Sequence, residues 1–123
     1  MTLQLTRRVV QPDATILEIK GSIHCGPECN QLSHEVDQLI EAGATRVIFD
    51  MSEVPHADSA AIGAIVKCFT KLKGANGALR IAGVQPMIGY SLKLTKVDQL
   101  IGIFPSVDQA AKEFSVPDVR QQN

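Results

Sequence analysis

Short apolar runs and longer apolar stripes alternate along the chain, with turn-forming residues between them. Residues 3–10 and 16–19 are apolar-rich runs on either side of a Gln-Pro-Asp turn at 11–13, which predicts a hairpin of two strands. From 27 to 43 the apolar positions recur every three or four residues between a proline and a glycine, which predicts a helix. Residues 47–49 form a continuous β-favouring run, which is typical of a buried strand.

The same alternation continues in the second half of the chain. Residues 62–72 carry an apolar stripe at helical spacing, and lysines gather near its C-terminal end, where the helix dipole favours cations. Residues 79–82 predict a further strand, and a proline at 86 opens a third helix. Residues 101–104 predict a short last strand.

A capping-box signature starts the predicted fourth helix, because Ser106 is followed three residues later by Gln109. We interpret residues 1–114 as one domain and residues 115–123, which are polar and have no period, as a C-terminal tail. The predicted order is ββαβαβαβα, which favours an α/β fold with right-handed parallel crossovers. We expect a mixed sheet of four to five strands packed with about four helices.

Composition narrows the function classes. The chain has 123 residues, 45% of them hydrophobic, which is enough for the core of one domain without disulfide or metal support. A net charge of -1 lacks the basic surplus that dominates nucleic-acid binding. No apolar run approaches the roughly 20 residues that span a bilayer, and the odd number of cysteines favours reduced thiols. We therefore expect a cytoplasmic protein with no membrane insertion.

The most informative stretch follows the buried strand, which we expect to end at Asp50. Asp58 is a good candidate for the N-cap of the second helix, because its carboxylate can accept from the amide of Ala60 or Ala61. Ser59 then occupies the first helical position, where a phosphate would lie at the favourable end of the helix dipole. Taken alone, an Asp-Ser pair at a helix start is also ordinary capping.

Other candidate sites are weaker. His24, Cys25 and Cys29 cluster in sequence, but a fourth ligand with metal-site spacing is missing. Cys68 could form a nucleophile-base-acid set with His56 and Asp58, yet helical rise places it about 15 Å from the Asp58 cap. The glycines match no phosphate-binding fingerprint. We therefore expect no metal, no cofactor and no enzymatic activity.

Residues 47–111 resemble a STAS domain, the fold of bacterial anti-sigma factor antagonists and of the cytoplasmic domains of sulfate transporters. The resemblance is carried by Val47-Ile48-Phe49-Asp50-Met51-Ser52, by Asp58-Ser59 followed by Ile62-Gly63, by Leu79-Arg80-Ile81-Ala82-Gly83-Val84, and by Val97-Asp98-Gln99-Leu100 leading to Phe104. The two N-terminal strands and Gly21-Ser22-Ile23 fit more loosely, so the likeness extends over nearly the whole chain.

This resemblance implies a phosphorylation switch in transcription regulation. In the antagonist members, the serine after the loop aspartate is the target of a serine kinase that is also the anti-sigma factor, and here that position is Ser59. The unphosphorylated antagonist binds the kinase and frees a sigma factor, phosphorylation releases the antagonist, and a PP2C-type phosphatase resets it. We expect the partner to contact Asp58, Ser59, Ala60, Ser22 and His56.

Two departures from the family pattern keep an alternative open. Ala60 and Ala61 stand where members commonly carry Ser or Thr and then Gly, and Ser22 stands where an acidic residue often follows the glycine. The alternative is a STAS scaffold that is not phosphorylated, acting in a stress-signalling assembly or in a lipid or anion transport system. We expect the exposed helix faces to be of ordinary polarity, which leaves the oligomeric state open.

Overall fold

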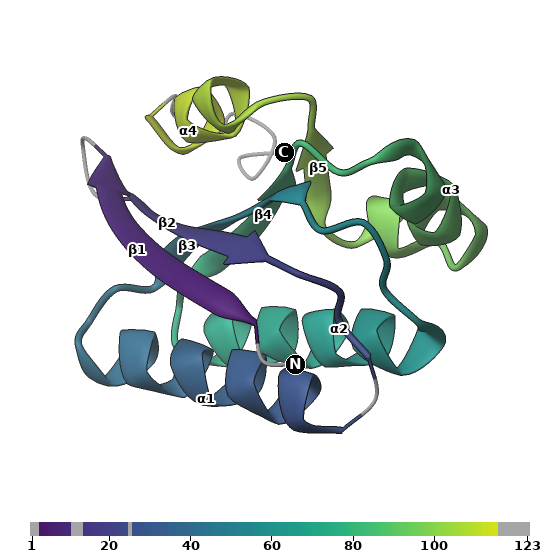
Figure 1. Cartoon of the computed structure of the whole chain (residues 1–123). Coiled ribbons are helices and arrows are strands. Elements are labelled where there is room, and N and C mark those ends of the chain that lie inside the picture. Colours follow the sequence, from purple (N-terminus) through teal and green to yellow (C-terminus); the bar gives the residue numbers. More distant parts are fainter. Residues whose placement is uncertain (1–2, 11–13, 25, 116–123) are drawn as a thin grey trace.

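The structure is a computed structural model that describes residues 3–10, 14–24 and 26–115. Its elements follow the predicted order, with one additional 3₁₀ turn, η1, before the last strand (Figure 1). The elements are β1 (Gln4–Val10), β2 (Ala14–Lys20), α1 (Pro27–Glu41), β3 (Arg46–Glu53), α2 (Ser59–Gly74), β4 (Ala78–Ala82), α3 (Pro86–Leu94), η1 (Val97–Gln99), β5 (Gly102–Phe104) and α4 (Val107–Ser115).

The five strands form one mixed sheet in the order β1-β2-β3-β4-β5. The first two strands pair antiparallel, and every other neighbouring pair is parallel. The register places Phe49 of β3 beside Leu17 of β2 and Ile81 of β4, so apolar residues line up across the middle of the sheet. The predicted fold class, a mixed sheet with about four helices, is confirmed.

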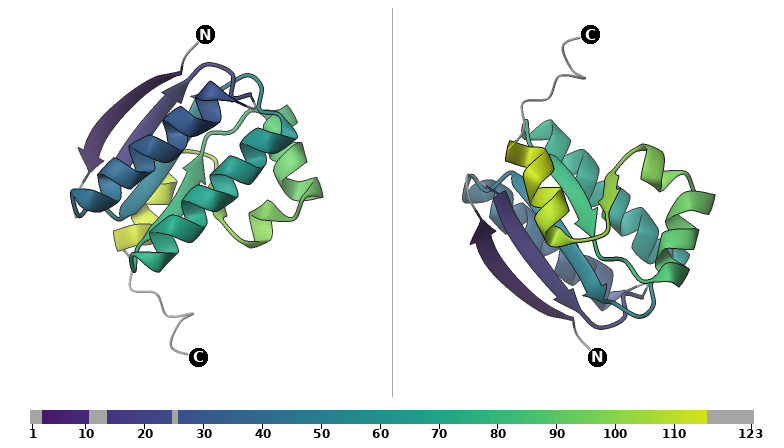
Figure 2. Two further views of the ribbon diagram at one scale, coloured as in Figure 1. Left: turned by 90° about the horizontal axis from the view of Figure 1, so that it is seen from below. Right: turned by 90° about the horizontal axis from the view of Figure 1, so that it is seen from above.

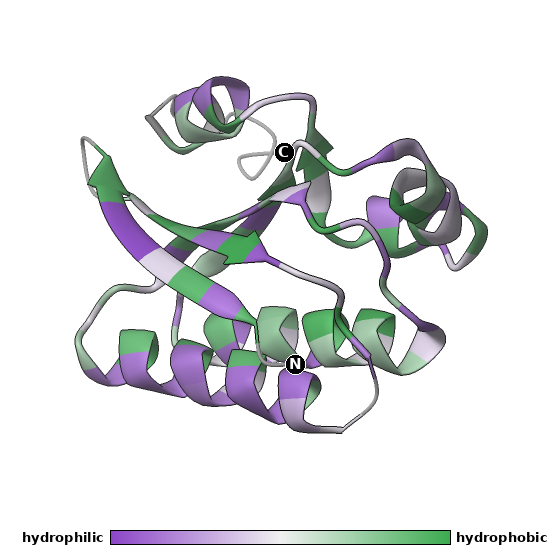
Figure 3. Ribbon diagram, in the orientation of Figure 1, coloured by the Kyte–Doolittle hydropathy of each residue, from purple (hydrophilic) through white to green (hydrophobic). Residues whose placement is uncertain are grey.

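Helices cover both faces of the sheet, but unequally. In Figures 1 and 2, α1 and α2 lie side by side across one face, α4 lies on the opposite face, and α3 stands at the β5 side above the start of α2. The larger core lies under α1 and α2 and includes the fully buried Phe49, Leu32 and Leu72. Figure 3 shows the corresponding pattern on α1, whose outer side is hydrophilic and whose inner side is apolar.

The smaller core holds α4 against the other face. Phe114 packs with Ile16, Ile48 and other apolar residues of the sheet. The guanidinium of Arg80 lies 4.8 Å from the centroid of the Phe114 ring, and that of Arg46 lies 5.9 Å from it. Arg46 also donates from Nη1 to the Phe114 carbonyl at 3.1 Å. Phe114 therefore joins the last helix to β3 and β4 by both packing and cation–π contacts.

The boundaries differ from expectation in one place that matters for the site. β3 continues three residues beyond Asp50, to Glu53, because its outer end still pairs with β2 through Lys20 and Glu53. The predicted turn at 11–13 and residues 116–123 of the predicted tail lie outside the described residues. Within the described ranges, no helix is both long and apolar enough to cross a membrane.

Candidate partner-binding site

The start of α2 has the geometry that the sequence predicts. Asp58 is the N-cap, in an extended backbone conformation, and its Oδ1 accepts from the amide of Ala61 at 2.8 Å. The amide of Ile62 donates to the Asp58 carbonyl at 3.1 Å, which closes the first helical turn. Ser59 is thus the first residue of the helix, and it is exposed. The sequence predicted that the Asp58 carboxylate accepts from the amide of Ala60 or Ala61, and the hydrogen bond from Ala61 is the one present.

The loop between β3 and α2, residues 54–58, is held in place by backbone contacts with Ile23, which follows β2 in the chain. Ile23 is fully buried and forms an isolated parallel bridge with Ala57. Its amide donates to the His56 carbonyl at 2.9 Å, and its carbonyl accepts from the Asp58 amide at 3.2 Å. Val54, at the start of the loop, is also fully buried. The loop therefore has backbone and core anchors immediately before the helix begins, so it presents Ser59 from a well-supported position.

Two hollows border the first turn of α2. The first, which we call the His56 groove, is about 300 Å³ and lies between the loop and α3. Its lining residues are His24, Pro55, His56, Ala57, Asp58, Met87, Ile88 and Ser91. The second, of about 440 Å³, lies between α1 and α2. Its lining residues are Gly26, Cys29, Asn30, Ser33, Ala60, Gly63, Ala64 and Lys67.

The Asp58 carboxylate makes the start of α2 less favourable for an added anion than the helix dipole alone would make it. The first amides of a helix have no intrahelical acceptor, and the Asp58 carboxylate already occupies that of Ala61. The other Asp58 oxygen, Oδ2, lies 3.9 Å from Nδ1 of His24, a contact that becomes an ion pair when the imidazole is protonated. A phosphate on Ser59 would gain from the helix dipole and the free amides, and would be repelled by the adjacent carboxylate.

The structure brings the five predicted contact residues to one region of the surface. Asp58 and His56 line the His56 groove, and Ala60 lines the hollow between the two long helices. Ser59 lies between them in the chain and is exposed. Ser22 is half-buried and directly precedes Ile23, whose bridge to Ala57 holds the loop. That these residues contact a partner remains a prediction.

The weaker candidates gain no support from the geometry. Cys68 is buried under the sheet, and burial raises the pKa of its thiol to about 12, so at neutral pH it is a protonated, poor nucleophile. Of the cysteine–histidine cluster, Cys25 lies outside the described residues, and Cys29 donates from Sγ to the His24 carbonyl at 3.2 Å. Among residues 3–10, 14–24 and 26–115, no three His, Cys, Asp or Glu side chains gather as a metal site would require.

Sequence reasoning missed an exposed apolar face next to the site. Met87, Tyr90 and Leu94 of α3 are 72%, 63% and 64% exposed, whereas Ile88 and Leu92 are buried. The expectation of ordinary polarity on exposed helix faces is therefore wrong for α3. The signal was present in the sequence, because this nine-residue helix has more apolar residues than one buried face can hold.

Comparison with known proteins identifies the fold family. The profile of the STAS domain family matches residues 6–110. The chain belongs to the STAS domain family. The matched range confirms the resemblance seen between residues 47 and 111, and it also takes in most of β1 and all of β2.

Relatives and solved STAS structures agree with this assignment. A Thermotoga maritima protein named as a candidate anti-sigma factor antagonist is 22% identical over 77 residues, which cover 63% of this chain and 68% of that protein. A crystal structure of a candidate antagonist from the same organism has a TM-score of 0.81 at 20% identity and covers 89% of this chain and 92% of that chain. SpoIIAA from Bacillus, in its phosphorylated form, has a TM-score of 0.69 at 13% identity and covers 90% of this chain and 99% of that chain. The chain therefore has the fold of these antagonists.

Proposed function

We propose that this STAS protein is an anti-sigma factor antagonist that binds an anti-sigma serine kinase and is released when that kinase phosphorylates Ser59. The observation that carries the proposal is the position of Ser59, an exposed hydroxyl-bearing residue at the first position of a capped helix. The fold it shares with SpoIIAA, a protein that has been solved in unphosphorylated and phosphorylated forms, supports the same reading.

The fold can carry the modification without unfolding. A phosphate at the first position of α2 lies at the positive end of the helix dipole, which is worth about 0.3 to 1 kcal/mol at an exposed helix end. This gain opposes the repulsion from Asp58. We therefore expect the phosphorylated protein to keep its structure, so that the phosphate acts mainly on the binding of a partner that covers the helix end.

We expect the charge of a phosphate on Ser59 to act mainly on the binding of the partner. A phosphoserine brings about -1.5 to -2 charges at neutral pH. Next to Asp58, a partner that covers the helix end would have to desolvate both anions or leave them unpaired. Each tenfold loss of affinity needs only about 1.4 kcal/mol, which one buried repulsive pair can exceed. Removal of the phosphate by a PP2C-type phosphatase restores the binding surface.

The modification is tested on the protein purified from its own cells. Phosphopeptide mapping by mass spectrometry should place the phosphate on Ser59, and a Ser59→Ala variant expressed in the same cells should lack it. Incubation with the co-purifying anti-sigma serine kinase and ATP should reproduce the same modification. Phosphate on a different residue, or none under any growth condition, would contradict the switch.

The release step is tested by affinity. The purified kinase should bind the unphosphorylated protein at least about tenfold more tightly than the phosphorylated one. The Ser59→Ala variant is the matched control, because it keeps the uncharged surface and should remain bound after incubation with ATP. Equal affinities of the two forms, or recovery of a transport ATPase with unmodified Ser59, would favour the scaffold alternative.

A further inference from the structure

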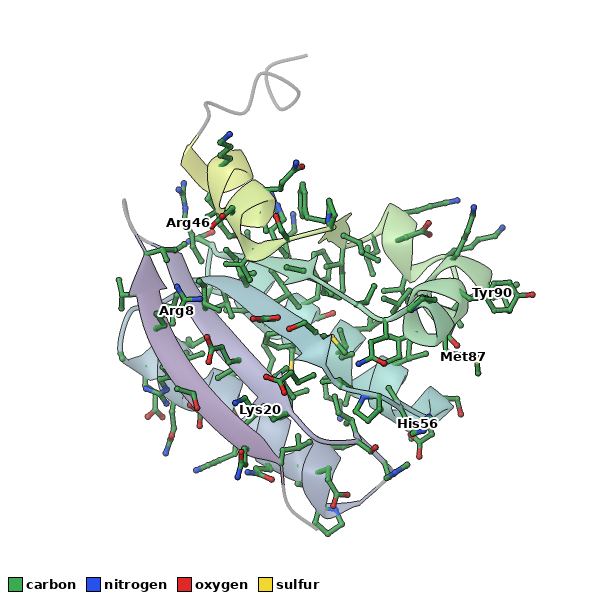
Figure 4. All side chains as sticks on the ribbon, turned by 45° about the horizontal axis from the view of Figure 1, so that its top comes forward. Arg8, Lys20, Arg46, His56, Met87 and Tyr90 are labelled. Atoms are coloured by element: carbon green, nitrogen blue, oxygen red, sulfur yellow. The ribbon has the colours of Figure 1, made fainter. Side chains whose placement is uncertain are left out.

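The exposed apolar face of α3 is larger than the fold requires. Ile88 and Leu92 already anchor the helix to the main core, while Met87, Tyr90 and Leu94 project from its other side. These three residues are spaced i, i+3 and i+7, so they share one helix face. Figure 4 shows Met87 and Tyr90 projecting from α3 on the side of the molecule that carries His56. We call these three residues the α3 face.

Cations accompany the α3 face. Lys93 lies on the last turn of α3, and Lys96 follows the helix in a left-handed backbone conformation. Both are exposed, and neither has an ion-pair partner within the described part of the chain. The nearest acidic residue in sequence is Asp98, which is also exposed and has no ion-pair partner among the described residues. Two lysines outnumber the one carboxylate, so the surface at this end of α3 combines apolar side chains with a net positive charge.

The α3 face continues into the Ser59 site. Met87, Ile88 and Ser91 form the α3 wall of the His56 groove, whose other wall includes Asp58. Asp58 directly precedes Ser59 and caps the same helix. A partner that covers the start of α2 on this side would therefore also cover the His56 groove and contact the α3 face.

We propose that the α3 face docks an acidic amphipathic helix of the same protein that engages Ser59, with apolar residues of that helix on Met87, Tyr90 and Leu94 and its carboxylates beside Lys93 and Lys96. The identity of the partner rests on the proposed function, but the docking surface does not. Charge complementarity selects this occupant. A second copy of the chain docked face to face would bring like charges together.

A membrane is a poorer match to the same surface. Two lysines attract an anionic bilayer only weakly, and a nine-residue helix with three exposed apolar side chains buries little area there. A protein helix offers apolar area and carboxylates at matching spacing. Tyrosine is also among the residues that contribute most to protein–protein binding energy.

The occupant is identified by photo-crosslinking in the protein's own cells. A Tyr90→p-benzoylphenylalanine variant should crosslink to a protein segment that contains apolar residues and carboxylates at helical spacing. A Val9→p-benzoylphenylalanine variant is the matched control, because Val9 is 71% exposed and lies on β1, remote in the fold from α3. A crosslink to a second copy of this chain, or none specific to position 90, would overturn the proposal.

Affinity for the captured partner, purified, separates the apolar and the charged contributions. The paired change Tyr90→Ser, Leu94→Ser should weaken binding by at least about tenfold, and the exposed control Val9→Ser should leave it unchanged. The paired change Lys93→Glu, Lys96→Glu should weaken binding at low salt and have a smaller effect at about 0.5 M NaCl. Lys73→Glu, a single change at the far end of α2, should leave binding unchanged.

Two further results distinguish this proposal from the switch at Ser59. If Ser59 carries no phosphate but Tyr90 still crosslinks to an acidic helix, the switch fails and the docking surface stands. If Ser59 is phosphorylated and the α3 variants bind the kinase with wild-type affinity, the switch stands and the docking surface fails. Binding of the protein to phosphatidylglycerol vesicles that is lost in the Lys93→Glu, Lys96→Glu variant would assign the face to a membrane and overturn the proposal.

Discussion

The Asp58 carboxylate accepts from the Ala61 amide at 2.8 Å, and this contact fixes the residue at which α2 begins. With the cap at Asp58, Ser59 falls at the first helical position and is exposed, while Ala61 turns into the core. A start one residue later would place Ser59 at the cap itself, where its hydroxyl would be occupied by the helix amides. The cap is therefore what leaves the serine available.

Replacement of Asp58 should separate its capping role from its charge. Asp58→Ala removes the acceptor for the Ala61 amide and should lower the free energy of unfolding by about 1 kcal/mol. Asp58→Asn keeps an oxygen at the same position and should stay close to the wild type, because Asn caps about as well as Asp. Urea denaturation followed by circular dichroism measures both. Equal stability of the Ala variant and the wild type would show that the cap does not hold α2.

The sequence was sufficient for the parts of the site that local chemistry determines. The N-cap, the first helical position and the capping box at Ser106, whose Oγ accepts from the Gln109 amide at 3.2 Å, each depend on residues within one helical turn. The element order was equally readable, because each helix and strand has its own apolar period. These features need no knowledge of what lies across the fold.

The rest depends on contacts between distant segments. The support of the loop by Ile23 and the wall that Met87 gives to the His56 groove join residues more than 30 positions apart in the chain. The length of β3 is set by pairing with Lys20 rather than by its own composition. In α3, apolar residues occupy two faces of the helix, so only the packed structure selects Ile88 and Leu92 as the buried pair.

Two glycines near the end of α2 should respond to alanine in opposite directions. At Gly77 an added Cβ would lie 2.1 Å from the Thr45 carbonyl oxygen, so Gly77→Ala should cost about 2 kcal/mol or more of stability. At Gly74, the last residue of α2, an added Cβ meets nothing within 4 Å. Gly74→Ala should therefore stabilise the protein by about 0.5 kcal/mol. Thermal or urea unfolding of the two variants measures the contrast, and a loss of stability at Gly74 equal to that at Gly77 would contradict it.

Phe114 should carry most of the attachment of α4. Phe114→Ala removes a nearly buried ring from the smaller core and should lower the free energy of unfolding by about 3 kcal/mol. Phe114→Leu keeps most of the apolar area but loses the cation–π contacts with Arg46 and Arg80, so it should cost less than half as much. Limited proteolysis should cut the Ala variant within α4 before the rest of the domain. Equal losses for the Ala and Leu variants would mean that the ring itself, rather than its volume, holds the helix.

The buried Cys68 thiol should make the protein less stable at high pH. Burial raises the pKa of this thiol to about 12 in the folded protein, whereas an unfolded cysteine titrates near about 8.5. Between these values the unfolded chain releases the proton and the folded chain keeps it, so rising pH favours unfolding, by up to about 1.4 kcal/mol per pH unit. Below about pH 8 both states are protonated and the group contributes no pH dependence.

The Cys68→Ala variant isolates this effect from other groups that titrate at high pH. At neutral pH the variant should be less stable than the wild type, because a buried side chain has been shortened. Above about pH 9 the difference should shrink, since only the wild type loses stability through the thiol. Urea unfolding of both proteins from about pH 7 to about pH 10.5 gives the two slopes. Parallel slopes would mean that Cys68 is solvated in the folded protein and ionises there as readily as in the unfolded chain.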